Sequence, residues 1–224
     1  MAPRKPPRRT RERILETALA LFNRLGEPHV TTGDIADELN ISPGNLYYHF
    51  RNKDDIIGEL YAALEVKIAP LTAVPPNRTA NADDLWLLFH LLFERMWEYR
   101  FFYRDLDEIT SRNRKIAQRF ADFNRRGENT VIELCNELVQ AGAMRATERE
   151  IAALAQNVLM VATYWMSWQR ISGRLSARDE ADATPDDRLT RAAYQVMALI
   201  APYLQGEARA LIEGLGADYL RLSA

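Results

Sequence analysis

Residues 31–53, TTGDIADELNISPGNLYYHFRNK, decide the fold of this chain. Two short helices are expected here, the first opening near Thr32 and the second following Ser42. Ser42 suits an N-cap, and Pro43 suits the first helical position, where its missing N–H costs nothing. Residues 40–41, Asn-Ile, supply the turn between the helices. Two helices joined by such a turn form a helix-turn-helix, whose second helix enters the DNA major groove.

The same stretch matches a known family. Its segments Ile35-Ala36, Ile41–Phe50 and Asn52-Lys53 resemble the DNA-binding domain of the tetracycline-repressor (TetR) family. The resemblance includes the string Leu-Tyr-x-His-Phe-x-x-Lys and covers residues 10–60, about a quarter of the chain. It implies an all-α protein, with an N-terminal three-helix helix-turn-helix DNA-binding domain and a larger C-terminal helical domain for ligand binding and dimerisation.

The second helix of the motif carries the expected base contacts. Short polar side chains near the N-terminus of such a helix read base edges, and asparagine can pair with adenine through two hydrogen bonds. The residues expected at this end are Ser42, Pro43, Gly44 and Asn45. The resemblance adds contacts to phosphate or to the groove wall from Thr32, Tyr47, Tyr48, His49 and Lys53. In an alternative interpretation, Tyr47 and His49 only pack this helix against the first helix of the domain.

The net charge of −2 hides an uneven distribution. Residues 1–13 hold six basic side chains and one acidic side chain, whereas residues 54–224 are net acidic. A basic end on an acidic protein points to a polyanion at that end. We expect residues 1–9 to form a disordered basic arm that follows the DNA backbone or reaches into a minor groove. The arginines expected to contact DNA are Arg8, Arg9 and Arg11. The alternative is a tail that only raises solubility.

Helical periodicity recurs along the chain, and no strand or internal repeat is expected. Residues 10–69 should form the helix-turn-helix domain, and residues 82–224 the ligand-binding and dimerisation domain. The intervening segment contains Pro75-Pro76 and reads as a loop, which marks the domain boundary. Helices of the second domain are expected over 83–99, 101–112, 113–141, 147–172 and 184–204, the last kinked at Pro202, with a short helix ending near 213.

Aromatic side chains gather on the segment 83–103 at helical spacing. Ligand pockets are mostly apolar and aromatic, with few polar groups. The residues expected to line a pocket are Trp86, Phe89, His90, Phe93, Trp97, Phe102, Phe120, Phe123, Met160 and Tyr164. The alternative for each of them is ordinary core packing. This set indicates a small apolar or aromatic effector.

A homodimer is expected because half-sites one helical turn apart are read by paired copies of a protein. Residues 158–168 are apolar nearly all round, and residues 189–204 carry an apolar stripe. The resemblance implies that these late helices pair with those of a second copy in a four-helix bundle. The expected interface residues are Val161, Trp165, Trp168, Leu189, Ala193, Val196, Ile200 and Leu204. The alternative is a core within one chain.

Signals of an enzyme are absent from the sequence. It contains no GxSxG, P-loop, HExxH or CxxC motif, and its three histidines lie far apart. We therefore expect no catalytic residues, no metal and no cofactor. The single cysteine, Cys135, and the lack of an apolar signal region after the basic N-terminus favour a cytoplasmic location.

The residues and the resemblance together predict a sequence-specific, DNA-binding transcriptional regulator. The expected form is a homodimeric repressor that a small apolar or aromatic ligand releases from a palindromic operator. Two alternatives stay open. One is a non-specific architectural DNA-binding protein, and the other is a helical small-molecule-binding protein or enzyme with a vestigial N-terminal domain.

Overall fold

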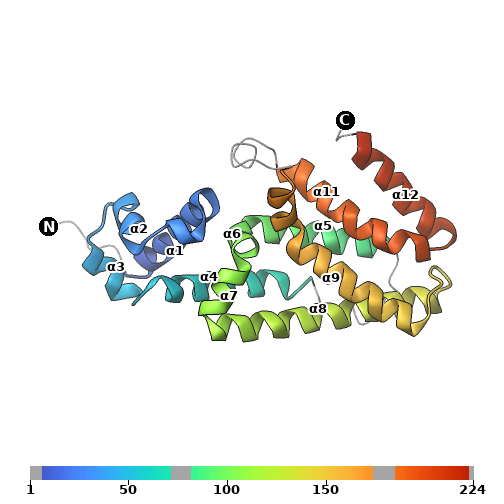
Figure 1. Cartoon of the computed structure of the whole chain (residues 1–224), viewed down its shortest axis with the longest axis horizontal. Helices are drawn as coiled ribbons and strands as arrows, with labels where there is room; N and C mark the ends of the chain where they lie inside the picture. The colour runs from blue at the N-terminus through green and yellow to red at the C-terminus, as the bar shows by residue number, and fades with distance from the viewer. Residues whose placement is uncertain (1–6, 72–81, 174–184, 222–224) are drawn as a thin grey trace. The chain divides into compact units, whose positions relative to one another are not determined.

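The computed structural model describes residues 7–71, 82–173 and 185–221, and these residues form helices joined by turns (Figure 1). Within these ranges there is no β-strand, and an isolated bridge joins Met144 to Leu204. The expected all-α class is therefore confirmed.

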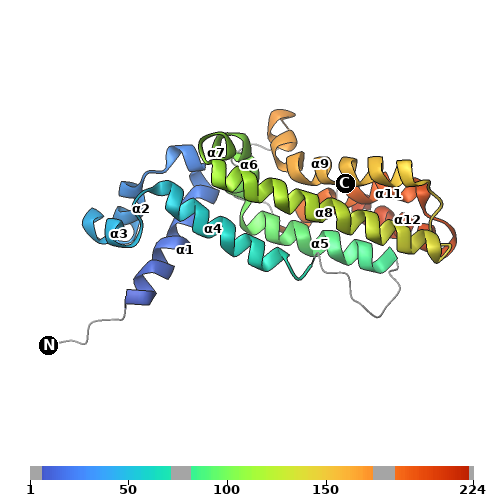
Figure 2. The same ribbon diagram turned by 90° about the horizontal axis from the view of Figure 1, so that it is seen from below.

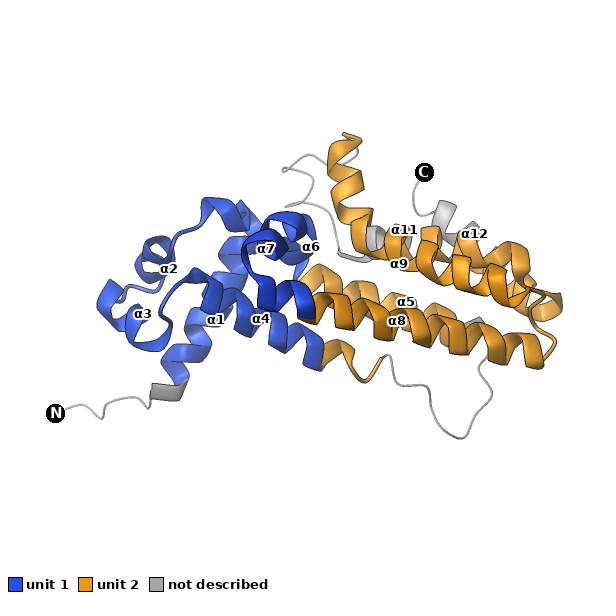
Figure 3. Ribbon diagram, turned by 60° about the horizontal axis from the view of Figure 1, so that its bottom comes forward, with its two compact units in different colours: residues 1–66, 99–118 blue, residues 67–98, 119–224 orange. Residues whose placement is uncertain are grey.

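The chain folds into two compact units, each built from two separate segments of the sequence (Figure 3). Unit 1 comprises residues 1–66 and 99–118, and unit 2 comprises residues 67–98 and 119–224. The chain thus leaves the N-terminal helices, enters unit 2, and returns to unit 1 before leaving it again. The expected division into consecutive domains, 10–69 and 82–224, does not include the return of residues 99–118 to the first unit.

Unit 1 is built on the helices that flank and include the motif. Its elements are α1 (Pro7–Leu25), η1 (Glu27–His29), α2 (Thr32–Glu38), α3 (Pro43–His49), most of α4 (Lys53–Ile68), α6 (Arg100–Arg104), α7 (Leu106–Arg112) and the start of α8. α1 ends where Gly26 takes a φ of 95°, which glycine adopts without a steric cost. Ile14, Phe22, Ile35 and Leu46 are fully buried and form the centre of this core.

The returning segment is held by aromatic packing. Phe101 lies against Phe22 with ring centroids 5.2 Å apart, and Phe102 stacks on Tyr61 at 4.7 Å. Phe101 and Phe102 are each 1% exposed. Burial of apolar surface drives such association, and it explains why this segment belongs with the N-terminal helices.

Unit 2 is a bundle of longer helices. Its elements are α5 (Ala82–Glu98), most of α8 (Arg114–Gln140), α9 (Glu148–Ile171), α11 (Pro185–Ile200), η2 (Ala201–Tyr203) and α12 (Gly206–Arg221). α11 packs against both α5 and α9. Figures 1 and 2 show α8 and α9 side by side, and a Cβ placed on Gly127 would lie 3.3 Å from Leu159 Cδ2.

Local signals placed most helix ends correctly. Thr147 caps α9 in a capping box with Glu150, and α8 ends before Gly142, whose φ is 71°. The helix expected over 101–112 is two helices, α6 and α7, which meet at Asp105. The helix expected over 184–204 ends at Ile200. The residues around Pro202 form a 3-10 turn, and the expected kink within a continuous helix is absent there. α12 extends well beyond the expected end near 213.

Candidate nucleic-acid interface

The helix-turn-helix is formed by local capping at both of its helices. Thr31 caps α2 by accepting a hydrogen bond from Asp34 N at 3.2 Å, and the Asp34 carboxylate accepts one from Thr31 N at 2.7 Å. The backbone and hydroxyl of Thr31 both donate to this carboxylate, and they hold the pKa of Asp34 below its usual value. Asn40 takes a φ of 53° in the turn, a conformation that asparagine tolerates. Ser42 then caps α3, with its hydroxyl accepting from Asn45 N at 3.2 Å.

α3 presents a polar and aromatic surface on one side and buries its apolar residues on the other. Leu46 and Phe50 are buried. The expected base-contacting residues are exposed: Ser42, Pro43, Gly44 and Asn45. Tyr47 is 52% exposed and Tyr48 81% exposed, so large aromatic surfaces lie open next to these residues. An exposed tyrosine offers both an apolar ring and a hydroxyl to a partner.

One hydrogen bond links the two helices across this surface. The hydroxyls of Thr32 and Tyr47 lie 3.1 Å apart. Thr32 is at the start of α2, so the bond fixes the ring of Tyr47 relative to that helix. His49 is half-buried and meets Tyr48 edge to face at 5.1 Å. The expected contact residues of α2 and α3 thus meet in two pairs, Thr32 with Tyr47 and Tyr48 with His49.

Two expected DNA contacts have partners inside the protein. Lys53 donates to the backbone oxygens of Glu27 and Val30 and forms an ion pair with the Glu27 carboxylate. Arg11 pairs with Glu59 at 2.9 Å and lies over the ring of Phe50 at 4.8 Å. The described structure therefore gives both side chains a role in packing the motif.

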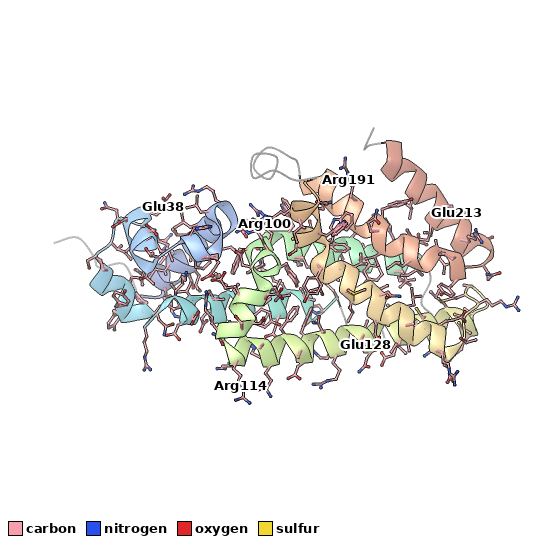
Figure 4. All side chains as sticks on the ribbon, in the orientation of Figure 1. Glu38, Arg100, Arg114, Glu128, Arg191 and Glu213 are labelled. Carbon is pink, nitrogen blue, oxygen red and sulfur yellow. The ribbon has the colours of Figure 1, made fainter. Side chains whose placement is uncertain are left out.

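The remaining cations of this region are more open. Arg9 is exposed, and the side chain of Arg8 and residues 1–6 lie outside the described part of the chain. Arg51, which follows α3, is also exposed and was not among the expected contacts. Its position next to a predicted reading helix is the sequence signal that could have identified it. On the surface of α2, Glu38 points outward (Figure 4), and its carboxylate lies 3.7 Å from Nη2 of Arg24.

A buried ionic cluster in unit 1 was not expected. The Glu27 side chain is fully buried, and its Oε1 lies 2.8 Å from Lys53 Nζ and 2.6 Å from Arg112 Nη2. Arg112 also contacts Asp54 at 3.1 Å and Glu108 at 3.5 Å. Burial alone would lower the pKa of Arg112, but its bonds to Glu27 and Asp54 outweigh that effect and raise it. Glu27 and Arg112 are 85 residues apart in the sequence, so no local pattern joins them.

A second set of polar contacts fastens α6 to α1. Asn23 Oδ1 accepts a hydrogen bond from Phe101 N at 3.0 Å, and Arg104 donates to the backbone oxygen of Phe22 at 2.6 Å. Asp105 accepts from Glu27 N at 3.0 Å. The motif and the returning segment of the chain are therefore one hydrogen-bonded body.

Comparison with known proteins agrees with this geometry. Residues 14–60 match the family model described as bacterial regulatory proteins, tetR family, and residues 64–212 match the TetR model described as bacterial transcriptional repressor. The chain belongs to the TetR family. The resemblance of its helix-turn-helix to that family is thus confirmed, and it extends to the C-terminal helices.

Individual TetR-family relatives differ in how much of the chain they match. A TetR-family transcriptional regulator from Marinobacter aquaeolei VT8 is 34% identical, covers 94% of this chain and 98% of its own, and has a TM-score of 0.83. The probable acrEF/envCD operon repressor of Escherichia coli K12 is 40% identical over 53 residues, which is 24% of this chain and about a quarter (24%) of that protein's own length. The structure of a SmeT–triclosan complex shares the fold at a TM-score of 0.56, with 16% identity over 89% of this chain and 94% of that one.

The expected pocket residues of this TetR-family chain lie on several different elements. Phe89 and Phe93 are each 1% exposed within α5, and Trp86 stacks on His90 with ring centroids 5.0 Å apart. Phe102 belongs to unit 1, where it packs on α4, so it lies in a different core from the α5 residues. Phe120 stacks on Phe123 at 6.3 Å along α8, and Trp97 is half-buried. Met160 and Tyr164 on α9 lie on the surface, 56% and 46% exposed.

The expected interface residues are divided between core and surface. On α11 and just after it, four of them are fully buried within the single chain and offer no surface to a second copy: Ala193, Val196, Ile200 and Leu204. This corrects their assignment, because α5 and α9 already cover α11. The side chain of Leu189 lies outside the described part. On α9, Val161 and Trp165 are half-buried, and Trp168 is 54% exposed.

The described residues contain neither a metal-binding cluster nor a membrane-spanning helix. Among them, no group of three or more histidine, cysteine, aspartate or glutamate side chains is arranged to hold a metal ion. No helix in the same ranges has both the length and the apolar character needed to cross a membrane.

Proposed function

We propose that this chain is a homodimeric transcriptional repressor, which binds a palindromic operator through α3 and is released by a small ligand. The observation that carries the proposal is the exposed face of α3, held on a buried apolar framework and tied to α2 by the Thr32–Tyr47 bond. A polar, aromatic surface on a short, rigid helix after a tight turn suits insertion into the major groove. Membership of the TetR family supports this role.

Base recognition is assigned to the N-terminal end of α3. Asn45 is exposed, and its side-chain amide can donate to and accept from adenine at the same time. The Ser42 hydroxyl already accepts the capping bond from Asn45 N, so its own O–H remains available as a donor. Gly44 adds no side chain between them, which permits a close approach to the base edges. Tyr47 and Tyr48 then contact the sugar-phosphate backbone or the groove wall.

The dimer is assigned to an exposed apolar stripe on α9. Met160, Tyr164, Trp168 and Ile171 follow at spacings of four, four and three residues, so they share one face of the helix. They are 56%, 46%, 54% and 80% exposed. A contiguous apolar surface of this kind marks an interaction site. A second copy is the proposed occupant, because a self-complementary patch gives the two-fold symmetry that a palindromic site requires.

A ligand site is assigned to unit 2, which holds the α5 aromatic residues and α9. Two buried polar atoms there, His90 Nδ1 and Trp165 Nε1, make no hydrogen bond within the described part of the chain. Leaving such an atom unsatisfied costs about 1–3 kcal/mol, and a ligand with a suitable polar group would recover that energy. The proposed effector is therefore a largely apolar or aromatic molecule that carries a hydrogen-bond acceptor for the indole N–H.

Selection from a pool of random DNA duplexes tests the proposal. The purified chain is incubated with the pool at near-physiological salt, and the bound fraction is sequenced. We expect an enriched inverted repeat whose two halves are related by two-fold symmetry. The Asn45→Ala variant serves as the matched control, and it should lose the preference at particular positions while still binding DNA. Recovery of unselected sequences by both proteins would favour a non-specific DNA-binding protein and reject the proposal.

A further inference from the structure

The ammonium group of Lys53 is directed into the protein. Its Nζ lies 2.8 Å from Glu27 Oε1, 3.0 Å from the backbone oxygen of Glu27 and 3.0 Å from that of Val30. A lysine ammonium has three N–H donors and no acceptor. Two of its donors are used in hydrogen bonds to backbone oxygens, and its charge is paired with the Glu27 carboxylate, so the ammonium is engaged within the protein and not directed toward DNA.

The environment of Glu27 opposes any outward movement of Lys53. The Glu27 side chain has no exposed surface, whereas the Lys53 side chain is 24% exposed. If Lys53 turned toward DNA, Arg112 would be the remaining ion-pair partner of the buried Glu27 carboxylate. Arg112 also forms ion pairs with Asp54 and Glu108. Removing one partner from a buried ion pair is strongly destabilising, and here it would leave the Glu27 carboxylate with one cation in place of two.

The contacts of Lys53 connect the segment before α2 to the start of α4, which follows α3. Glu27 and Val30 lie between α1 and α2, and Lys53 is the first residue of α4. α2 and α3 lie between these two points in the sequence. The two hydrogen bonds and the ion pair therefore hold the entry to α2 against the exit from α3, and they link both ends of the helix-turn-helix.

We propose that Lys53 is a positioning residue, which sets the α2–α3 pair through Glu27 and makes no phosphate contact of its own. This inference rests on the proposed DNA-binding function. It assigns the lysine of the motif a different role from that expected from the sequence. Lys53 acts on DNA binding only through the geometry of α3.

The salt dependence of DNA binding separates the two roles. Each protein–phosphate contact releases counterions, so loss of one contact reduces the slope of log K against log salt by about one. For full-length Lys53→Met on the selected duplex, we expect an unchanged slope, a weaker affinity at every salt concentration, and a thermal midpoint lower by roughly 5 °C or more. A slope reduced by about one, with the thermal midpoint unchanged, would overturn the inference.

A double variant supplies the control. Glu27→Gln combined with Lys53→Met leaves the net charge of the chain unchanged and removes the buried carboxylate that has lost its lysine partner. We expect it to recover much of the thermal midpoint and the affinity lost in Lys53→Met, and it remains informative if the single variant does not fold. If Lys53 binds phosphate, Glu27→Gln will restore neither affinity nor slope. A wild-type chain that selects no duplex would refute the proposed function, whereas a reduced slope in Lys53→Met refutes only this inference.

Discussion

Trp168 provides a quantitative test of the proposed dimer. Its side chain is 54% exposed in the single chain. A large aromatic side chain buries up to about 250 Å², so complete contact with a second copy would cover roughly 130 Å² more. At about 25 cal/mol per Å², this burial contributes about 3 kcal/mol per copy. A symmetric interface contains two copies of the residue, and half-complete burial of both gives about 3 kcal/mol for the dimer.

We therefore expect Trp168→Ala to raise the dimer dissociation constant by about a hundredfold. Sedimentation velocity across a wide range of protein concentrations measures this constant directly. Tyr48→Ala is the matched control, since Tyr48 is an even more exposed aromatic residue, at 81%, but lies on α3. It should sediment like the wild type and bind DNA more weakly. Equal self-association of Trp168→Ala and the wild type would refute the assignment of the α9 stripe to the dimer.

Three further outcomes are expected. Tyr47→Phe removes the hydroxyl bonded to Thr32; affinity should fall by a similar factor for all duplex sequences in anisotropy titrations, and a change in base preference would contradict this role. Asp34→Asn weakens the α2 cap; because folding lowers the pKa of Asp34, the carboxylate stabilises the protein above its unfolded pKa near 4, and this contribution is lost as pH falls through the lower folded value. The thermal midpoints of variant and wild type should thus differ at pH 7 and converge in acid; a constant difference would argue against the cap. Burial raises the pKa of the Cys135 thiol to about 11, so thiol reagents at pH 8 should label it only as fast as the chain opens, and rapid labelling of the native protein would show that it is accessible.

The helix-turn-helix could be predicted from sequence because its determinants are local. The cap at Ser42 and the turn at Asn40 depend on neighbours within about four residues, and so does the cap at Thr147, which begins α9 outside this motif. Such signals act before tertiary structure forms, and the structure agrees with them. The family resemblance rests on this same segment.

The features that the sequence could not predict depend on contacts distant in sequence. Periodicity correctly placed Ala193, Val196 and Ile200 on one face of a helix, but it could not show that α5 and α9 cover that face. The Glu27–Arg112 pair spans 85 residues and leaves no pattern in either segment. Lys53 fits a DNA-contact motif, and only the positions of its three acceptors reveal an inward role.

Methylation interference on the selected duplex tests most directly whether two copies of α3 enter the major groove. Guanine N7 lies on the floor of that groove, so its methylation should block binding wherever α3 makes contact. We predict two clusters of guanines at which methylation blocks binding, related by two-fold symmetry and separated by about one helical turn. In Asn45→Ala, methylation at both clusters should have a smaller effect on binding. A single cluster, or binding unaffected by any major-groove methylation, would contradict the account.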